Sequence, residues 1–418
     1  MKSIQDLPFI PTKYRNVMSK ASHDAQVLAL GTVIKFLPQQ RPFMFTGPDS
    51  SYKLIGSMVD AGYKKILVIA DPGLVKLGLI QPFIDKIKAL GANPALYDGI
   101  EPDPSYAVVH DGIKAAKAHN TEAILAVGGG SSLDAAKVIA ASISNNCEPS
   151  KFVGYFKVRK PMLPFYAIPT TSGTGSEVTM AAVISNLEKK CKDAMADTKL
   201  IPHFVALDPT LQYGLPASIT AATGIDALTH AVESYVSVIA TAQTRVQSKM
   251  ATKLIFKSLA TACEEGGNEE ALENMQMAAT YAGMALSRAS LGYVHAYAHQ
   301  FGALYHIPHG HANAIALPYV FEFYLGGDDA CVERIAELAD EVGIGAKKDD
   351  SLTRAKKFVD AIKKLNKRIG IPATLDAIQE SDFDDIVQRA LTEAQGTYPV
   401  PRYMNRKDCE AVLRKMMS

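Results

Sequence analysis

The feature that most restricts the fold of this chain is an alternation of short apolar runs with amphipathic helical segments, which fills the first half of the sequence. Apolar runs with the length of buried β-strands lie at residues 65–70, 122–127, 165–168, 178–184 and 204–207. Segments with helical spacing of apolar residues lie between them, at residues 79–90, 105–120 and 133–142. Strands that alternate with helices predict βαβ units and a largely parallel sheet.

The alternation ends at Asp208 and Pro209, and helical patterns dominate from Pro216 onward. We therefore predict a change of architecture near these residues. The expected organisation is a polar helical lead-in over residues 1–40, an α/β domain with a parallel sheet over residues 41–210, and an all-helical domain over residues 211–418.

Composition narrows the class of protein. Apolar residues make up 48% and charged residues 21% of the 418 positions, which is typical of a globular protein and not of a disordered one. The formal net charge of +1 gives no electrostatic reason to expect nucleic-acid binding. No run approaches the roughly 18 apolar residues that span a bilayer. The most apolar N-terminal stretch, residues 25–37, starts too late for a secretory signal. We expect no nucleic-acid partner and no membrane partner.

The cysteines are few and widely spaced. They are Cys147, Cys191, Cys263, Cys331 and Cys409. An odd number of cysteines without a CxxC pair argues against a disulfide framework and against a thiolate zinc site. This usage predicts inert structural thiols in a reducing cytoplasm.

A glycine-rich turn joins a predicted strand to the helix that follows it. The segment AVGGGSSLDAAK places Gly128, Gly129 and Gly130 in a row, followed by Ser131 and Asp134. Glycines let the backbone approach a ligand closely, and the free N–H groups and positive dipole at a helix start suit a pyrophosphate. A plain βα turn is the alternative, and the chain has no GxGxxG motif.

A second loop, IPTTSGTGS, follows another predicted strand and carries the hydroxyls of Thr170, Thr171 and Thr174. Taken alone, it is also compatible with a capped turn. Two such loops in one βαβ domain favour a shared phosphorylated ligand. The α/β domain is therefore predicted to bind a dinucleotide.

Asp71 directly follows the predicted strand at residues 65–70. A carboxylate at such a strand end accepts hydrogen bonds from both ribose hydroxyls and repels a 2′-phosphate. Its position therefore favours NAD over NADP. A turn-forming aspartate before Pro72 is the alternative interpretation.

Histidines are concentrated in the helical half, where six of the ten fall between positions 230 and 311. Asp226 and His230 lie four residues apart, so they project from one face of a helix. His295 and His299 repeat this spacing, and His309 follows within a Pro-His-Gly turn. A lone histidine is usually structural, but this density indicates a metal site. Imidazole and carboxylate ligands without thiolates suit Fe(II), Zn(II), Mn or Co.

Together these segments resemble the iron-containing (group III) alcohol dehydrogenases, a family that includes lactaldehyde reductase. Four stretches carry the resemblance: GGGSSLDAAK, PTTSGTGSEVT, ATGIDALTHAVESYVS and VHAYAHQFGALYHIPHG. The resemblance implies an N-terminal α/β dinucleotide-binding domain followed by an all-helical metal-binding domain, with the active site between them. It also implies a homodimer.

The resemblance assigns roles to individual residues. The family holds its metal with one aspartate and three histidines, and the matching positions are Asp226, His230, His295 and His309. His299 matches a histidine near the substrate, which we interpret as a catalytic proton relay. The positions that match the family's cofactor contacts are Asp71, Gly128, Gly129, Gly130, Ser131, Asp134, Thr170, Thr171, Thr174 and Lys192.

The predicted function is reversible hydride transfer between NAD and a small primary alcohol or its aldehyde, with a divalent metal polarising the substrate oxygen. Fe(II) is favoured over Zn(II), because four protein ligands and a substrate exceed the three-ligand site usual for catalytic zinc. The alternatives are a polyol dehydrogenase of the glycerol type, an NAD-using lyase like dehydroquinate synthase, and a metal hydrolase.

Overall fold

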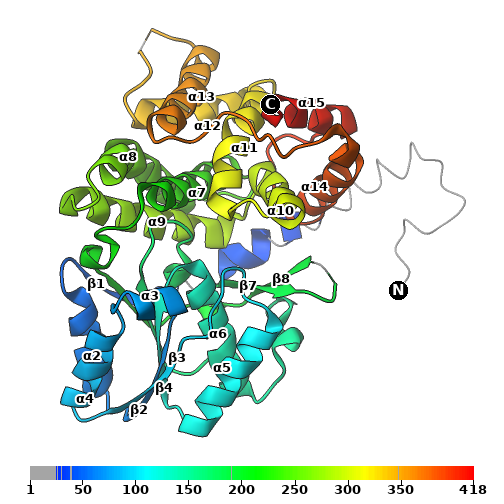
Figure 1. Ribbon diagram of the computed structural model, residues 1–418. Helices are drawn as coiled ribbons and strands as arrows, with labels where there is room; N and C mark the ends of the chain where they lie inside the picture. Colours follow the sequence, from blue (N-terminus) through cyan, green and yellow to red (C-terminus); the bar gives the residue numbers. More distant parts are fainter. Residues whose placement is uncertain (1–24, 26, 30, 38–39, 190, 347) are drawn as a thin grey trace, which may run out of the picture.

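The computed structural model describes residues 25–418 except residues 26, 30, 38, 39, 190 and 347. Figure 1 shows two halves, an α/β half that contains the sheet and a helical half that contains the C-terminus. Most of the predicted lead-in over residues 1–40 lies outside the described residues. Within the described residues, no helix combines the length and the apolar character needed to cross a bilayer.

A six-stranded parallel sheet forms the centre of the α/β half. Its strand order is β1-β9-β6-β4-β2-β3, and every neighbouring pair is parallel. The strands are β1 (Phe43–Thr46), β2 (Lys65–Ile69), β3 (Asn93–Tyr97), β4 (Ala123–Gly128), β6 (Phe165–Pro169) and β9 (Phe204–Leu207). The predicted parallel sheet is confirmed, and four of the predicted apolar runs coincide with β2, β4, β6 and β9.

Helices cover both faces of this sheet (Figure 1). One core packs α2 (Ser50–Asp60) and α4 (Gln81–Ala89) against strand residues such as Ile66, Val68 and Leu125. The other packs α5 (Tyr106–His119) and α6 (Gly130–Asn145) against the alternate residues, such as Leu67 and Ile124. Strands buried on both faces are almost continuously apolar, which made them recognisable in the sequence. The helices of this half are α2 (Ser50–Asp60), α3 (Pro72–Lys76), α4 (Gln81–Ala89), α5 (Tyr106–His119) and α6 (Gly130–Asn145).

The sequence patterns missed β1 and β3 because these strands are the two edges of the sheet. Most of their residues are partly or fully exposed, so no continuous apolar run marks them. Pro94 lies within β3, and proline is tolerated there because an edge strand leaves one row of backbone groups unpaired.

A smaller sheet of order β5-β8-β7 lies beside the main one. Its strands are β5 (Gly154–Tyr155), β7 (Ala181–Asn186) and β8 (Cys191–Ala196), and β7 pairs with β8 in an antiparallel hairpin. The strand predicted at residues 178–184 starts only at Ala181, because a 3-10 turn precedes it. The 3-10 turns are η2 (Pro149–Phe152), η3 (Ser176–Val178), η4 (Thr198–Leu200), η5 (Pro209–Gln212) and η6 (Glu380–Asp382).

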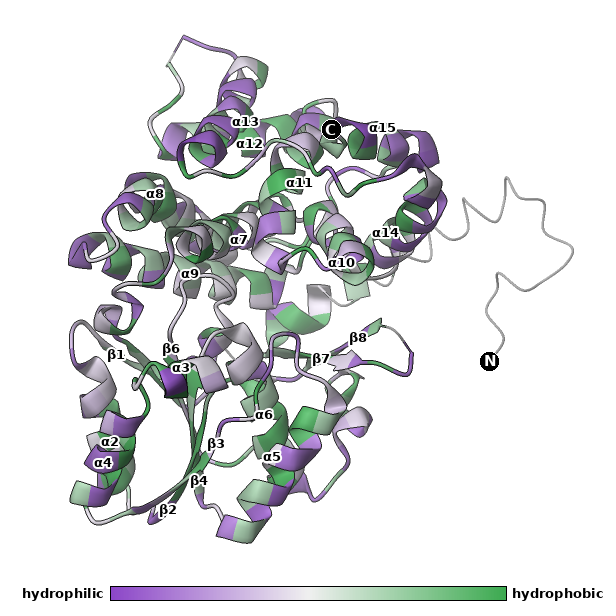
Figure 2. Cartoon of the chain, viewed as in Figure 1, coloured by the Kyte–Doolittle hydropathy of each residue, from purple (hydrophilic) through white to green (hydrophobic). Residues whose placement is uncertain are grey.

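The architecture changes between the end of β9 at Leu207 and the start of α7 at Ala217. The helices beyond this point are α7 (Ala217–Val236), α8 (Ala242–Glu264), α9 (Glu269–Ala289), α10 (Tyr293–Tyr305), α11 (His309–Tyr324), α12 (Asp329–Glu341), α13 (Ser351–Arg368), α14 (Phe383–Thr397) and α15 (Arg406–Met416). One apolar core includes residues from all of these helices. Figure 2 shows polar residues on the outer helices α13 and α15.

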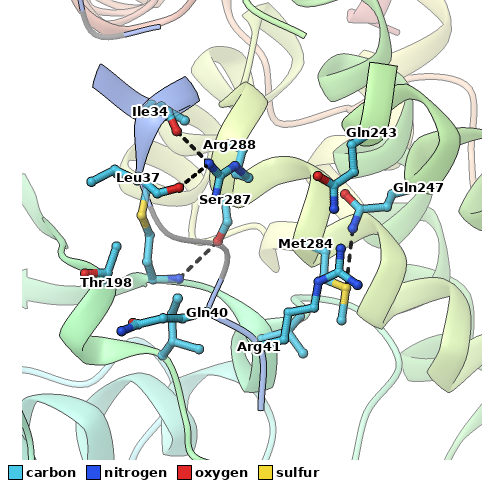
Figure 3. A pocket seen from close by; sticks show the side chains of 13 residues that line it. Ile34, Leu37, Gln40, Arg41, Thr198, Gln243, Gln247, Met284, Ser287 and Arg288 are labelled. Atoms are coloured by element: carbon cyan, nitrogen blue, oxygen red, sulfur yellow. Dashed lines mark hydrogen bonds between the residues drawn. The ribbon is translucent and has the colours of Figure 1, made fainter. Parts of the chain in front are cut away.

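The described end of the lead-in packs at the boundary of the two halves. Arg288, at the end of α9, donates hydrogen bonds to the carbonyls of Ile34 at 2.6 Å and Leu37 at 3.0 Å. These carbonyls belong to the end of a short helical stretch, so Arg288 caps it. Figure 3 shows this contact beside a pocket that the lead-in, the α/β half, α8 and α9 line together.

A buried polar network fixes α6 to the strand hairpin. Asp134 accepts hydrogen bonds from the Ser176 hydroxyl at 2.5 Å and the Val183 N–H at 2.9 Å. Lys137, one turn later and fully buried, donates to the carbonyl of Ala181 at 2.9 Å. Burial raises the pKa of the Asp134 carboxyl and lowers the pKa of Lys137 to about 8. The helix that follows the glycine turn is therefore held by polar groups as well as by apolar packing.

Replacing Asp134 with alanine removes these two hydrogen bonds and reduces the counter-charge around Lys137. We expect the free energy of unfolding to fall by about 1–3 kcal/mol, measured by denaturant titration. Asp111→Ala on α5 is the matched control, because Asp111 forms an exposed ion pair with Lys114, and its effect should stay within about 0.5 kcal/mol. Equal losses in the two variants would contradict this role of Asp134.

Candidate functional site

One face of α7 carries three buried polar side chains. Asp226, His230 and Glu233 occupy positions i, i+4 and i+7, so they project from the same face. Their exposed fractions are only 3%, 5% and 2%. Carboxylates and imidazoles are rarely buried unless they are paired or bind a ligand, which marks this face as a candidate site.

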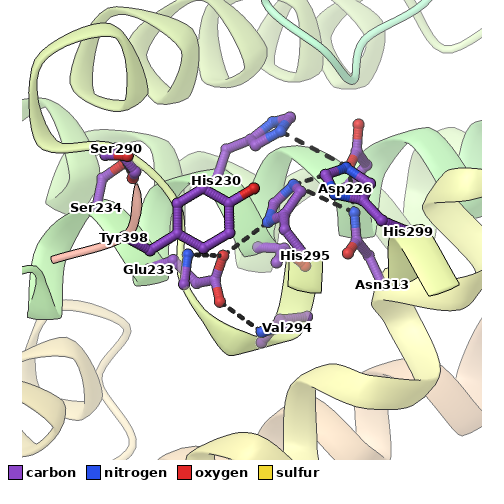
Figure 4. Close-up of polar contacts among 12 residues, drawn as sticks. Asp226, His230, Glu233, Ser234, Ser290, Val294, His295, His299, Asn313 and Tyr398 are labelled. Atoms are coloured by element: carbon purple, nitrogen blue, oxygen red, sulfur yellow. Dashed lines mark hydrogen bonds and ion pairs between the residues drawn. The ribbon is translucent and has the colours of Figure 1, made fainter. Parts of the chain in front are cut away.

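Helices α10 and α11 bring two more histidines to Asp226. From the Asp226 Oδ1 atom, the Nε2 atoms lie 3.8 Å away in His230, 3.9 Å away in His295 and 3.6 Å away in His309. The ligand atoms of Asp226, His230 and His295 all lie within 4.8 Å of one another. Figure 4 shows these three side chains facing a common centre. The structure thus brings together the four residues predicted to hold the metal.

This donor set fits a divalent metal ion. Tetrahedral ligands at about 2.0–2.2 Å lie about 3.3–3.6 Å apart. The distances from Asp226 Oδ1 to the three histidine nitrogens exceed this by a few tenths of an ångström at most. Burial, together with the neighbouring imidazoles, holds the pKa of His295 well below its ordinary value. Burial also lowers the pKa of His309 to about 4. Both rings are therefore neutral near pH 7 and offer nitrogen lone pairs, as metal binding requires.

Glu233 is a site residue that the sequence reasoning did not single out. Its carboxylate lies 2.6 Å from Nδ1 of His295 and accepts the N–H groups of Gly292 at 2.9 Å and Val294 at 2.7 Å. Burial raises the pKa of Glu233 to about 8, and the two backbone N–H groups act in the opposite direction. The contact with Nδ1 directs Nε2 of His295 toward Asp226. In the sequence, its position seven residues after Asp226, on the same helix face, could have indicated it.

Asn313 on α11 is a second residue that the sequence reasoning missed. Its Nδ2 atom donates to Asp226 Oδ1 at 2.7 Å and lies 3.3 Å and 3.1 Å from Nε2 of His295 and His309. The amide nitrogen therefore faces three of the four candidate ligand atoms. An asparagine four residues after His309 carries no recognisable signal in the sequence.

His299 lies at the edge of this group, one turn after His295 on α10. Its ring centroid is 5.3 Å from that of His309 and 6.1 Å from that of His295. The Nδ1 atom lies 2.6 Å from Oε1 of Glu393, and about a quarter of the side chain is exposed. His299 is therefore placed beside the candidate ligands and is held by a different carboxylate.

The glycine turn has the backbone that its sequence predicts. Gly128 has a φ of 150°, and a Cβ atom there would lie 2.4 Å from the Ser132 hydroxyl, so the position requires glycine. Helix α6 starts directly at Gly130, with Gly129 as its N-cap and no side-chain cap, so its first N–H groups are available to a ligand. Ser131 lies in this first turn, and its hydroxyl accepts a hydrogen bond from the Asp103 N–H at 3.3 Å.

The loop that carries Thr170, Thr171 and Thr174 (the threonine loop) packs directly on the glycine turn. The Thr170 N–H donates to the Gly128 carbonyl at 3.1 Å. Gly130 lies against the side chain of Thr174, and Gly129 faces Thr171; these are the positions where a Cβ atom would meet threonine atoms. The predicted cofactor residues of these two loops are thus neighbours in space. Their contact with a dinucleotide remains a prediction.

Three other predicted cofactor residues have defined partners. Asp71 caps α3 by accepting the Leu74 N–H at 3.0 Å, and its second oxygen lies beside Gly128. Lys192 on β8 forms a 2.6 Å ion pair with Asp103. Asp134 is directed into the network described above, where it accepts hydrogen bonds from Ser176 and Val183.

The loop between β6 and η3 joins the two groups of residues. Gly173 lies against Thr223, which precedes Asp226 by almost one turn of α7. Glu177 accepts a hydrogen bond from the Thr280 hydroxyl of α9 at 3.0 Å. The threonine loop therefore packs, at the boundary of the two halves, on the helix that carries Asp226 and His230.

Comparison with known proteins agrees with this arrangement. The family model for iron-containing alcohol dehydrogenase matches residues 42–209, and that for the C-terminal part of the Fe-containing alcohol dehydrogenase family matches residues 220–417. Alcohol dehydrogenase 4 of Saccharomyces cerevisiae (strain YJM789) is 38% identical over 355 residues, covering 84% of this chain and 91% of that protein. Lactaldehyde reductase of Escherichia coli (strain K12) is 36% identical, covering 81% and 90%. A crystal structure of 1,3-propanediol oxidoreductase superposes with a TM-score of 0.87 at 35% identity, covering 91% and 100%.

The chain belongs to the iron-containing alcohol dehydrogenase family. It is accordingly an oxidoreductase that acts on CH–OH groups. The predictions of family, fold class and enzyme class are confirmed.

Substitution of Gly310 tests whether the position of His309 depends on the close packing of α11 against α7. A Cβ atom at Gly310 would lie 2.3 Å from the Ala222 carbonyl oxygen, so Gly310→Ala must push the start of α11 away from α7. We expect at least about tenfold weaker binding of Fe(II) or Zn(II), measured by competition with a chelating dye. In the control Gly302→Ala on α10, the nearest atom is 3.7 Å away, and metal affinity should stay unchanged. Equal affinities in the two variants would contradict the requirement for close packing.

Proposed function

We propose that this protein is an NAD-dependent alcohol dehydrogenase that interconverts a small primary alcohol and its aldehyde and uses a divalent metal, with Fe(II) favoured over Zn(II). The observation that carries the proposal is that Asp226 gathers three histidines beside it and lies on α7, a helix that packs at Thr223 against the threonine loop, which in turn packs on the glycine turn. A metal hydrolase would not require two loops that are suited to binding a dinucleotide.

The residues of the chain have two kinds of role, which are to position the metal and the cofactor and to transfer a proton. When bound, the metal would supply Lewis acidity to the substrate oxygen and NAD would accept the hydride. Asp226, His230, His295 and His309 would hold the metal, and the free N–H groups at the start of α6 would hold the pyrophosphate. His299 is left to carry a proton between substrate and solvent, because its ring lies beside the ligands and is partly exposed.

The substrate class is inferred from the names of the relatives. The names of the relatives refer to alcohols, lactaldehyde and 1,3-propanediol, all of which suggest a small, uncharged substrate. Asp71 supports NAD, because its carboxylate lies beside the glycine turn. We also propose that the protein is a homodimer and that it lies in the cytoplasm. All five cysteines are free thiols, which agrees with a reducing compartment.

The deciding experiment is NADH formation by anaerobically purified protein with a panel of short alcohols and diols. The protein is assayed as purified, after chelation, and after addition of Fe(II) or Zn(II) separately. Turnover that is lost on chelation and restored by one metal supports the proposal and names the metal. Absence of NADH under every condition, with NAD still bound, would favour a lyase.

The ligand assignment predicts a selective effect of His295→Ala. Because His295 Nε2 lies among the candidate ligand atoms, the variant should lose at least tenfold in metal affinity and nearly all turnover. NAD binding, followed by fluorescence quenching, should remain within about twofold, since the loops that would bind it lie in the other half. Full activity in this variant would overturn the assignment.

The assignment of Asp71 predicts a change of cofactor preference. In Asp71→Asn the helix cap on α3 is retained, because asparagine is also a good N-cap, whereas the charge that repels a 2′-phosphate is lost. The ratio of kcat/KM for NADP to that for NAD should rise about tenfold. Unchanged selectivity would mean that another residue contacts the ribose.

A further inference from the structure

A partly buried carboxylate on α14 holds the imidazole of His299. Glu393 Oε1 lies 2.6 Å from Nδ1 of His299 and also accepts the Tyr398 hydroxyl at 2.5 Å. Its second oxygen accepts the side-chain amide of Gln300 at 3.0 Å. The group thus joins α10, α14 and the segment after α14 around one carboxylate.

The protonation of this group follows from its partners. Burial opposes the charged form of Glu393, but His299 and the hydrogen bonds from Tyr398 and Gln300 outweigh it and lower its pKa. Burial and the neighbouring carboxylate raise the pKa of Tyr398 well above its ordinary value, so its hydroxyl stays protonated and donates. An ionised carboxylate only accepts hydrogen bonds, so Nδ1 of His299 must carry the hydrogen.

The second nitrogen of His299 has a different environment. Among the residues that the structure describes, none forms a hydrogen bond with Nε2 of His299. In the neutral ring, a hydrogen on Nδ1 leaves the lone pair on Nε2. The ring is partly exposed and lies beside His309, which places it at the edge of the predicted active site.

We infer that Glu393 is a positioning residue: it orients His299 and fixes the tautomer with hydrogen on Nδ1, so that Nε2 is the atom that exchanges a proton with substrate or solvent. This inference rests on the proposed function, and it adds a residue from a helix that carries none of the predicted site residues. Tyr398 and Gln300 hold Glu393 in place.

The kinetic test is a double-mutant cycle of Glu393→Gln and His299→Ala in the full-length, metal-loaded protein. Glutamine keeps the shape of Glu393 but loses the charge and can also donate to Nδ1. We expect Glu393→Gln to lower kcat about tenfold or more, with metal content, NAD affinity and KM within about twofold of the wild type. In the His299→Ala background, the same substitution should change kcat less than twofold. An equal loss in both backgrounds, or an unchanged kcat in the first, would overturn the inference.

Nitrogen NMR of the metal-free protein tests the tautomer independently of activity. With labelled histidine at pH 8, the His299 signals, identified by their loss in His299→Ala, should show hydrogen on Nδ1 in the wild type. They should show a mixture or the other tautomer in Glu393→Gln. Hydrogen on Nε2 in the wild type would overturn the inference even if the variant failed to fold. This readout also separates failure of the inference from failure of the proposed function, since it requires no turnover.

The chain offers a matched control pair. His110 Nε2 lies 2.9 Å from a Glu148 carboxylate oxygen on the surface of the α/β half. Glu148→Gln removes the same kind of contact without touching α10 or α14. It should leave kcat and the His299 signals unchanged, and any effect as large as that of Glu393→Gln would contradict a specific role for Glu393.

Discussion

The contact between Glu233 and His295 is the interaction on which the candidate metal site depends. The two side chains are almost completely buried and lie 2.6 Å apart. The same carboxylate accepts the N–H groups of Gly292 and Val294, which have no partner within the helix because they lie at the start of α10. One group on α7 therefore fixes both where α10 begins and how its first histidine points. A ligand set drawn from three helices needs this kind of support, because each ring would otherwise rotate freely.

Helix α7 also connects the two halves of the molecule. It carries Asp226 on its buried face and, one turn earlier, Thr223, which packs against Gly173 of the threonine loop. The hydrogen bond between Glu177 and Thr280 holds η3, which directly follows this loop, to α9. Hydride transfer requires two bound groups at a constant separation, and positioning of this kind accounts for much of the rate that an enzyme gains. The close packing at Gly173 is the physical means by which this fold sets that separation.

Whether a strand or a site residue could be predicted from the sequence depended on where it lies in the fold. Strands β2, β4, β6 and β9 were predicted because burial on both faces makes them apolar, whereas the edge strands β1 and β3 were missed because they are half exposed. Asp226 and His230 were recognisable as a pair because they share a helix turn. Glu233 and Glu393 were not singled out, because their histidine partners lie 62 and 94 residues away in the chain. Asp134 was predicted as a cofactor contact. Its side chain accepts hydrogen bonds from Ser176 and Val183, and a contact with the cofactor stays a prediction.

The sequence by itself determined the order of architectures, the family, the two glycine-containing loops and the four candidate metal ligands. The architectures and the loops are local features that follow from periodicity and from glycine at turns. The four ligands lie on three helices, and the resemblance to a known family assigned them. Only the tertiary structure decided which carboxylate orients which histidine, and that the threonine loop meets α7 at Thr223. Such contacts join segments that are distant in the chain, and they depend on how the helices pack together. No pattern within a single segment encodes them.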